Sequence, residues 1–469
     1  MKKNTSVENE MKSTDRDFTK GKMSANITKM AIPVIVAQIS HLLYNIVDRM
    51  FIGRLGDEGV LALTGVGLCF PIITIVTAFT NLCGTGGAPL CSMARGRGDE
   101  DEAKGIMSNA FIMLTFLVAV IMLIAYAAKR PLLYAFGASD DTIGYADAYL
   151  TVYMTGTLFS MLGLGMNAYI NAQGFGRTGM ISILIGAALN IVLDPIFIFA
   201  LDMGIKGAAI ATVISQVVSC VWVLYFLMKK ATIRLTLRKM RFNFALARRM
   251  IALGVSSFIM QVTNSAVQAA CNATLSSYGG DIYVAVMTVV HSVREIVTLP
   301  FERFSAGAVP VLSFNYGAKE YARVREGVRF LTLVNMCLAG TTTLLVMLFP
   351  AFAIRIFNHD AALLDAGVKC MRIYFCCMFF MAFQNSGQQT FVSLGYSRHA
   401  IFFSLLRKAV LVVPLTLLLP RIGGLGVYGV FLAEPISEVI GGLAAYTTMR
   451  LTAWRHLVEA EQLAAASEN

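Results

Sequence analysis

The sequence predicts an all-α polytopic membrane protein, with twelve transmembrane helices arranged as two six-helix lobes related by a pseudo-twofold axis. Three observations predict this fold: a strongly apolar composition, recurring apolar runs of membrane-spanning length, and a motif that occurs once in each half. Of the 469 residues, 57% are hydrophobic and 14% are charged, and the mean hydropathy is +0.66. A soluble protein of this size carries more charge on its surface.

Twelve apolar segments of the chain are long enough to cross a membrane as helices. A helix needs about 20 residues to span a hydrocarbon core of roughly 30 Å, and the apolar pattern supplies such segments one after another. The predicted spans are 31–52, 60–85, 106–128, 146–170, 178–200, 206–228, 250–275, 282–308, 328–350, 367–391, 400–420 and 426–449.

The two halves of the chain repeat one motif. Residues 86–96 read G-x-x-P-x-x-S-x-x-x-G, and residues 307–317 read the same way. An even number of spans in each half inserts both copies in the same orientation, which gives a pseudo-twofold axis along the membrane normal. Duplicated hydrophobic halves are typical of secondary transporters, whose substrate path lies between the repeats.

A basic segment separates the sixth span from the seventh and divides the chain. The predicted organisation is a cytoplasmic N-terminal segment, a six-helix lobe, a basic cytoplasmic linker, a second six-helix lobe and a cytoplasmic tail. Their bounds are 1–29, 30–228, 229–249, 250–449 and 450–469.

The net charge of +11 is explained by topology rather than by a nucleic-acid partner. Lysines and arginines gather before the first span, in the linker and after the eighth span, and all three segments fall on one side when twelve spans are threaded. The positive-inside rule makes that side the cytoplasm and places both termini there. We therefore expect a multi-pass protein of the cell (inner) membrane whose partners are the lipid bilayer and a small-molecule substrate, and which functions as a monomer.

The sequence offers no support for an enzyme. Residues 174–179 fit G-x-G-x-x-G, but two apolar spans flank them where a dinucleotide site needs a strand and a helix, so a tight turn is expected. The sequence contains no G-x-x-x-x-G-K-[ST] motif, and the five histidines show no metal-ligand spacing. We expect no cofactor and no metal site, unless a sodium ion serves as a coupling ion.

Carboxylates inside the first half point to ion coupling. Asp48 lies in the first predicted helix, Asn190 and Asp194 are one turn apart on the fifth, and Thr212 lies on the sixth. Ionisable groups at membrane depth are expensive and mark functional sites by default. Two nearby carboxylates in a low dielectric take up a proton or a cation. The alternative is a helix-packing cluster in which Asp48 pairs with Arg49.

Neutral polar side chains recur at helical spacing on several spans and predict the polar face of a central substrate cavity. They are Gln38, His41, Asn45, Thr77, Asn81, Gln261, Asn264, Gln268, Gln384 and Gln388. The seventh helix repeats the stripe of the first, but Cys271 stands where Asp48 would be.

The second half has its own charged residues within apolar spans, namely Arg294, Glu295, Arg407 and Glu434. By the repeat offset, Glu434 occupies the position of Thr212. Two interpretations stay open: an internal ion-pair network that holds the lobe together, or cavity-facing groups that hold a cationic substrate.

Taken together, the motifs resemble the multidrug and toxic compound extrusion (MATE) family of secondary transporters, over residues 25–450. The matching features are Pro33, Val47-Asp48, Gly53, the 86–96 run, Gln173-Gly174, Asn190-x-x-x-Asp194 and Gly207-x-Ala209-x-Ala211-Thr212. The resemblance implies two six-helix lobes and export driven by a proton or sodium gradient. It also implies a cation site formed by Asp48, Asn190, Asp194 and Thr212.

Two departures from the family pattern refine the expectation. Arg49 follows Asp48 where the family has a small polar residue, and the seventh helix lacks the acid that one branch uses as a second site. The sequence therefore resembles the bacterial type whose cation site lies in the N-terminal lobe. It predicts a cation-coupled (H⁺ or Na⁺) antiporter that exports amphipathic, often cationic molecules by alternating access. The alternative is a lipid-linked saccharide or lipid flippase of the same broad superfamily, and a channel is a third option.

Overall fold

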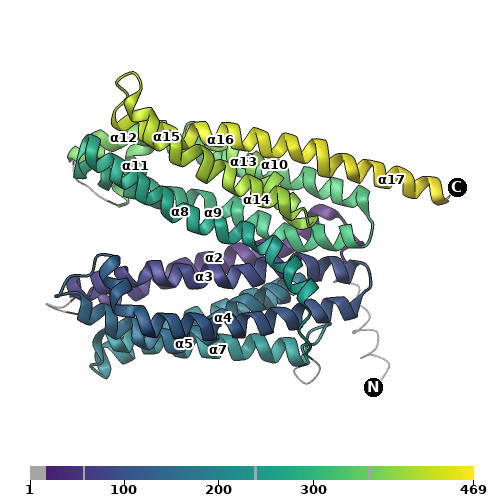
Figure 1. Ribbon diagram of the computed structural model, residues 1–469, viewed down its shortest axis with the longest axis horizontal. Coiled ribbons are helices and arrows are strands. Elements are labelled where there is room, and N and C mark those ends of the chain that lie inside the picture. The colour runs from purple at the N-terminus through teal and green to yellow at the C-terminus, as the bar shows by residue number, and fades with distance from the viewer. Residues whose placement is uncertain (1–16, 56–58, 237–239, 358–360, 469) are drawn as a thin grey trace. The chain divides into compact units, whose positions relative to one another are not determined.

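The computed structural model describes residues 17–55, 59–236, 240–357 and 361–468. These residues form helices joined by short turns, with no strand among them (Figure 1). The predicted all-α class is confirmed.

The chain forms two compact units, and the boundaries between them fall inside two helices. Among the described residues, the first unit is Ile32–Gly254, and the second is Asp17–Ala31 together with the chain from Val255 onward. The chain therefore passes from one unit to the other within α2 (Met23–Ile52) and again within α8 (Phe244–Gly279).

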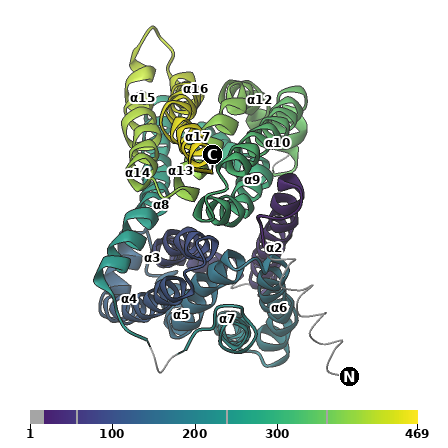
Figure 2. The ribbon, with the colours of Figure 1, turned by 90° about the vertical axis from the view of Figure 1, so that its right-hand side faces the viewer.

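The first unit contains most of α2, the start of α8 and the helices between them (Figure 2). In chain order these are α3 (Gly59–Gly96), α4 (Glu100–Ala135), α5 (Ile143–Ala172), α6 (Gly176–Pro195), the π-helical turn η2 (Ile196–Ala200) and α7 (Gly204–Lys229). Helix α5 packs against α3, α4 and α7.

The second unit contains the first residues of α2, the rest of α8 and the following helices. These are α9 (Asp281–Gly317), α10 (Tyr321–Leu348), α11 (Pro350–Arg355), α12 (Ala361–Phe375), η4 (Met378–Phe380), α13 (Met381–Ser393), α14 (Ser397–Leu405), η5 (Leu406–Val412), α15 (Val413–Leu418), η6 (Leu419–Arg421), α16 (Val427–Met449), η7 (Arg450–Trp454) and α17 (Arg455–Glu468).

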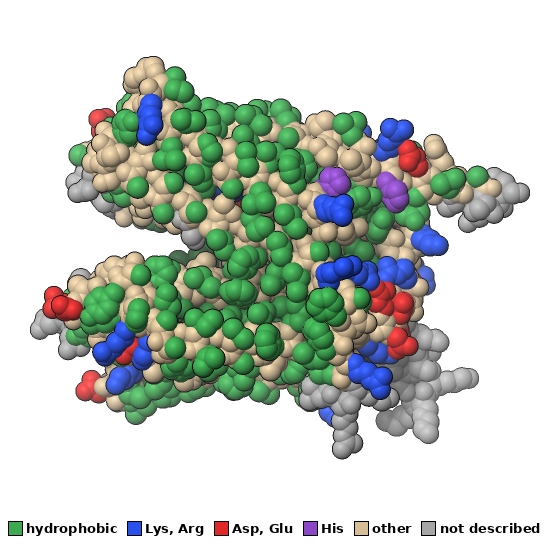
Figure 3. Space-filling view, viewed as in Figure 1, with side chains coloured by type: hydrophobic (Ala, Val, Ile, Leu, Met, Phe, Trp, Pro, Cys, Tyr) green, Lys and Arg blue, Asp and Glu red, His purple; other side chains and the backbone are tan. Residues whose placement is uncertain are grey.

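Each of the twelve predicted spans lies in helical structure. Eleven helices among the described residues are long and apolar enough to cross a membrane. The predicted span 146–170 forms α5, which is not among those eleven because its tyrosine, threonine, glycine and asparagine residues lower its hydropathy. On the face of each unit seen in Figure 3, hydrophobic side chains cover the middle and charged side chains gather toward the ends, as a bilayer requires.

The tenth and eleventh predicted spans are interrupted helices. The tenth consists of α12, η4 and α13, and the eleventh consists of α14, η5, α15 and η6. Pro414, the second residue of α15, has no N–H to donate to the preceding turn, and the chain widens there into the π-helical turn η5.

Residues 17–31 belong to the second unit; the sequence predicts a cytoplasmic N-terminal segment over 1–29 and a first lobe that begins at residue 30. The ring of Phe18 meets that of Phe314 edge-on at 5.6 Å. The guanidinium of Arg323 donates to the Phe18 and Gly21 carbonyls, each at 3.0 Å. The sequence could not show this, because the partners lie about 300 residues away.

The repeated motif marks equivalent helix crossings. A Cβ on Gly86 would lie 2.3 Å from the Met250 carbonyl oxygen, so the glycine lets α3 contact the start of α8. A Cβ on Gly307 would lie 2.4 Å from Cα of Ala31, so α9 contacts the start of α2 in the same way. The motif serines, Ser92 and Ser313, donate to the carbonyls of Ala172 at 3.0 Å and Ser393 at 2.8 Å. The repeat therefore encodes packing.

Replacing Gly254 with alanine should destabilise the first unit, because the new Cβ would lie 2.0 Å from the Leu82 carbonyl oxygen. Relieving such a clash between two backbones costs about 1–3 kcal/mol. The matched control is Gly67→Ala in α3, where no atom lies within 4 Å of the new Cβ and the helix gains up to ~1 kcal/mol. Thermal unfolding of both variants in detergent checks this. Equal melting temperatures would contradict it.

Candidate functional site

The four residues predicted for ion coupling come from three helices of the first unit and are all buried. Asp48 lies on α2, Asn190 and Asp194 lie on α6, and Thr212 lies on α7. Their exposed fractions are 7% for Asp48, 2% for Asn190, 0% for Asp194 and 8% for Thr212.

These side chains form one hydrogen-bonded group. The amide of Asn190 donates to Asp194 Oδ1 at 3.0 Å and to Thr212 Oγ1 at 3.4 Å. Asp48 lies near Asp194, so the group contains two neighbouring carboxyl groups. A hydrogen bond between two carboxyl groups needs a proton between them, because an ionised carboxylate has no donor.

Three acceptor oxygens of this group are buried without a hydrogen-bond partner. They are Asp48 Oδ1, Asn190 Oδ1 and Asp194 Oδ2. A buried acceptor without a partner costs about 1–3 kcal/mol, and more when it is charged, so a cluster built only for helix packing would satisfy these oxygens. Carboxylate and amide oxygens suit a hard cation. The arrangement can therefore take up a proton or a small cation.

The local sequence explains how α6 and α7 bring these groups together. Pro195 has no N–H for α6, and the chain continues as the wide turn η2. A Cβ on Gly207 would lie 2.5 Å from the Phe197 carbonyl oxygen, so this glycine allows α7 to lie against η2. That contact places Thr212 opposite Asn190.

Arg49 is directed toward an aromatic ring and not into a direct ion pair with Asp48. Among the described residues no ion pair joins the two side chains, and the guanidinium of Arg49 lies 4.2 Å above the ring centre of Phe70. The predicted alternative, a packing cluster with Asp48 paired to Arg49, therefore does not describe this geometry.

Three tyrosines that the sequence pattern did not single out lie around the carboxylates. Tyr44 lies one turn before Asp48 and close to both acids, and Tyr149 lies close to Asp48. The rings of Tyr149 and Tyr153 stack at 5.9 Å. The i, i+4 spacing of Tyr44 and Asp48 was a signal that could have identified the first of them.

The residues predicted for the substrate cavity have different environments. Eight of them are partly or fully exposed: Gln38, His41, Asn45, Thr77, Asn81, Gln261, Asn264 and Gln268. Gln384 and Gln388 are instead buried inside the second unit. The amide of Gln388 donates to the Ala400 carbonyl at 2.8 Å and to Ser404 Oγ at 2.9 Å, and these bonds link α13 to α14.

Three of the four charged residues predicted in the second half come together. Arg294 and Arg407 both pair with Glu434, at 2.7 and 3.0 Å. Glu295 is exposed on α9, and it forms no ion pair with any described residue. Lys408 was missed, although it follows Arg407 within an apolar span, and it pairs with Glu434 at 2.9 Å.

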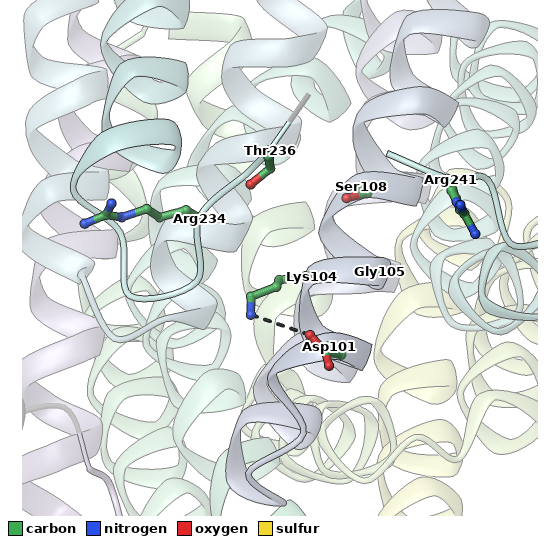
Figure 4. Close-up of a pocket in the computed structure, with 7 residues that line it drawn as sticks. All are labelled: Asp101, Lys104, Gly105, Ser108, Arg234, Thr236 and Arg241. Atoms are coloured by element: carbon green, nitrogen blue, oxygen red, sulfur yellow. Dashed lines mark ion pairs between the residues drawn. The ribbon is translucent and has the colours of Figure 1, made fainter. Parts of the chain in front are cut away.

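A separate pocket of about 260 Å³ lies between α4 and the linker (Figure 4). Its lining consists of Asp101, Lys104, Gly105, Ser108, Arg234, Thr236 and Arg241. Lys104 pairs with Asp101 at 3.6 Å. The pocket shares no residue with the carboxylate group.

Comparison with known proteins adds the family. The sequence model of the MatE family matches residues 33–196 and 256–418, one segment in each half. The multidrug export protein MepA of Staphylococcus saprophyticus is 24% identical over 447 residues, which cover 95% of this chain and 98% of that protein. MepA of Staphylococcus aureus is 21% identical with the same coverage.

Solved structures share the fold. A crystal structure of MATE in the bent conformation superposes with a TM-score of 0.89 at 21% identity, covering 96% of this chain and 99% of the other. The outward-facing conformation of a multidrug resistance MATE family transporter gives 0.86 at 22% identity, covering 95% and 98%. Because the family model matches well over half of the sequence, in both repeats, this chain belongs to the MatE family of membrane transporters, which are not enzymes.

Proposed function

We propose that this protein is a cation-coupled antiporter that exports amphipathic, often cationic small molecules by alternating access of its two lobes. The main support for ion coupling is the buried group of Asp48, Asn190, Asp194 and Thr212, in which three acceptor oxygens have no hydrogen-bond partner. Relatives named multidrug export proteins that match nearly the full chain support small-molecule export.

The coupling follows from the energetics of burying charge. With both carboxyl groups ionised, closing this group away from water leaves two like charges in a low dielectric, which costs several kcal/mol. One bound proton or sodium ion lowers that cost and completes the hydrogen bonding or coordination of the oxygens. The loaded and empty forms therefore prefer different conformations, and a gradient of the ion drives the cycle.

The experiment is ATP-independent efflux of a fluorescent cationic dye from proteoliposomes, with proton and sodium gradients imposed separately. Export driven by one of the two gradients supports the proposal and identifies the ion. An export rate that is the same with and without either gradient would contradict ion coupling.

The flippase alternative receives less support. Flipping a pyrophosphate-linked glycan calls for several cationic groups free to meet the phosphates. The buried cations Arg294, Arg407 and Lys408 all contact Glu434, and with Glu438 beside them they hold a surplus of a single positive charge, which is too little to balance a pyrophosphate.

We also propose that the protein lies in the cell membrane as a monomer with both termini in the cytoplasm, because its basic segments fall on one side. The exposed Arg234 in the linker tests this. In a variant lacking the nine native cysteines, Arg234→Cys should react with an impermeant maleimide only after the cytoplasmic face is opened. Labelling in intact cells would contradict the topology.

A further inference from the structure

The buried ion-pair cluster of the second unit includes a residue that aligns with the carboxylate group of the first. Repeat alignment places Glu434 where the first half has Thr212, and Tyr374 where it has Tyr153. The structure brings both together, because Arg294 bridges Glu434 at 2.7 Å and the Tyr374 hydroxyl at 3.2 Å. At these two aligned positions the second half therefore has a glutamate and a tyrosine that an arginine bridges, where the first half has neutral side chains.

This cluster holds more positive than negative charge. A single oxygen, Glu434 Oε1, contacts Arg294 at 2.7 Å, Arg407 at 3.0 Å and Lys408 at 2.9 Å. The one other carboxylate within the cluster is Glu438, one turn further along α16, which makes no ion pair with a described residue. Three cations thus face two carboxylates, and buried charge is stable only when it is compensated.

No further described carboxylate forms an ion pair with the three cations. Glu302 lies two turns beyond Arg294 on α9 and acts on it through space, but it forms no ion pair with a described residue. His291 lies beside Tyr374, with ring centres 6.1 Å apart, and adds no negative charge. Within the cluster of described residues in direct contact, one positive charge is therefore left for a further partner.

Several hydrogen-bonding groups of the cluster and its neighbours have no partner. Glu438 is 1% exposed and its Oε2 has no partner, and Oε1 of the buried Gln384 has none either. Arg407 has five N–H groups, of which Nη1 is bonded to Glu434. Gly441 lies between Arg407 and Gln384, and a Cβ there would come within 3.1 Å of both side chains.

We propose that this cluster of Arg294, Arg407, Lys408, Glu434 and Glu438 binds one monovalent anionic group, the carboxylate of an exported compound. A single carboxylate balances the surplus charge and accepts from the unused donors of Arg407 and Lys408. The side chain of Arg294 is 15% exposed, the largest value in the cluster, and forms its entrance. This inference rests on the proposed export function and adds that the substrates include zwitterions.

The test is equilibrium binding to the purified full-length protein by fluorescence polarisation. The probes are two rhodamine dyes that differ only in a free carboxylate or its methyl ester. Wild-type protein should bind the acid about tenfold more tightly than the ester, the effect of one charge-assisted hydrogen bond. Equal affinities would overturn the proposal without any variant.

Two variants and one control locate the effect. Lys408→Met should abolish the preference for the acid, and Gly441→Ala, which keeps every charge, should weaken acid binding more than ester binding. Lys369→Met removes an exposed lysine from the same unit and should change neither affinity. An unchanged acid-to-ester ratio in folded Lys408→Met or Gly441→Ala would place the carboxylate elsewhere.

Replacing chloride with the bulky isethionate distinguishes a substrate carboxylate from an inorganic anion. The acid preference should be the same in both salts. A preference seen only without chloride would show that chloride occupies the cluster, and would overturn the assignment. Gradient-driven efflux of the ester is measured in parallel, since its absence in wild type argues against the proposed function and not against the anionic site.

Discussion

Asp194→Asn should reduce gradient-driven dye export to the background of liposomes without protein, while the protein stays folded. The substitution keeps the shape of the side chain and an oxygen to accept from Asn190, which now donates to Oδ1 at 3.0 Å. It removes the negative charge that binds a proton or a cation. Asp48→Asn should have the same effect, because Asp48 supplies the other carboxylate of the buried group.

The matched control for both variants is Asp141→Asn, which changes an exposed aspartate of the same unit. Initial efflux rates under each gradient, and melting temperatures in detergent, are compared across the three variants. Export at the wild-type rate by either Asp48→Asn or Asp194→Asn would show that this group does not couple transport to the ion.

Glu434→Gln should destabilise the protein by roughly 3–5 kcal/mol, the cost of breaking a buried ion pair by removing one partner. Glu434 is 3% exposed, and its Oε1 contacts Arg294, Arg407 and Lys408. A neutral amide leaves these cations in mutual repulsion. The transport that remains should keep the ion dependence of wild type, because the carboxylates that we propose for coupling lie in the other unit.

Glu295→Gln is the control for this prediction, since it makes the same chemical change at an exposed position of the same unit and should alter stability by less than about 0.5 kcal/mol. The double variant Glu434→Gln/Lys408→Met should recover part of the loss because it removes one unpaired cation. Unfolding in detergent measures all three. Equal stability of the two single variants would rule out a stabilising role for Glu434, and a shifted ion dependence would place a coupling site in the second unit.

The sequence alone determined the class of fold and the order of its helices. Membrane spans are local features, because each needs a continuous apolar run that a single stretch of sequence either contains or lacks. The sequence also predicted the duplication, because residues 86–96 and 307–317 share one motif. In the structure, the glycines and serines of both copies lie at equivalent helix contacts. The face shared by Asn190 and Asp194 followed from helical spacing.

Only the tertiary structure decided which residues far apart in the sequence meet. It placed residues 17–31 with the second unit, buried Gln384 and Gln388, and brought Lys408 to Glu434 beside two arginines. Periodicity describes one helix at a time, and it contains no information on which face of another helix lies opposite. The charge balance of a buried cluster depends on which helix faces pack together, so it can be determined only from the tertiary structure.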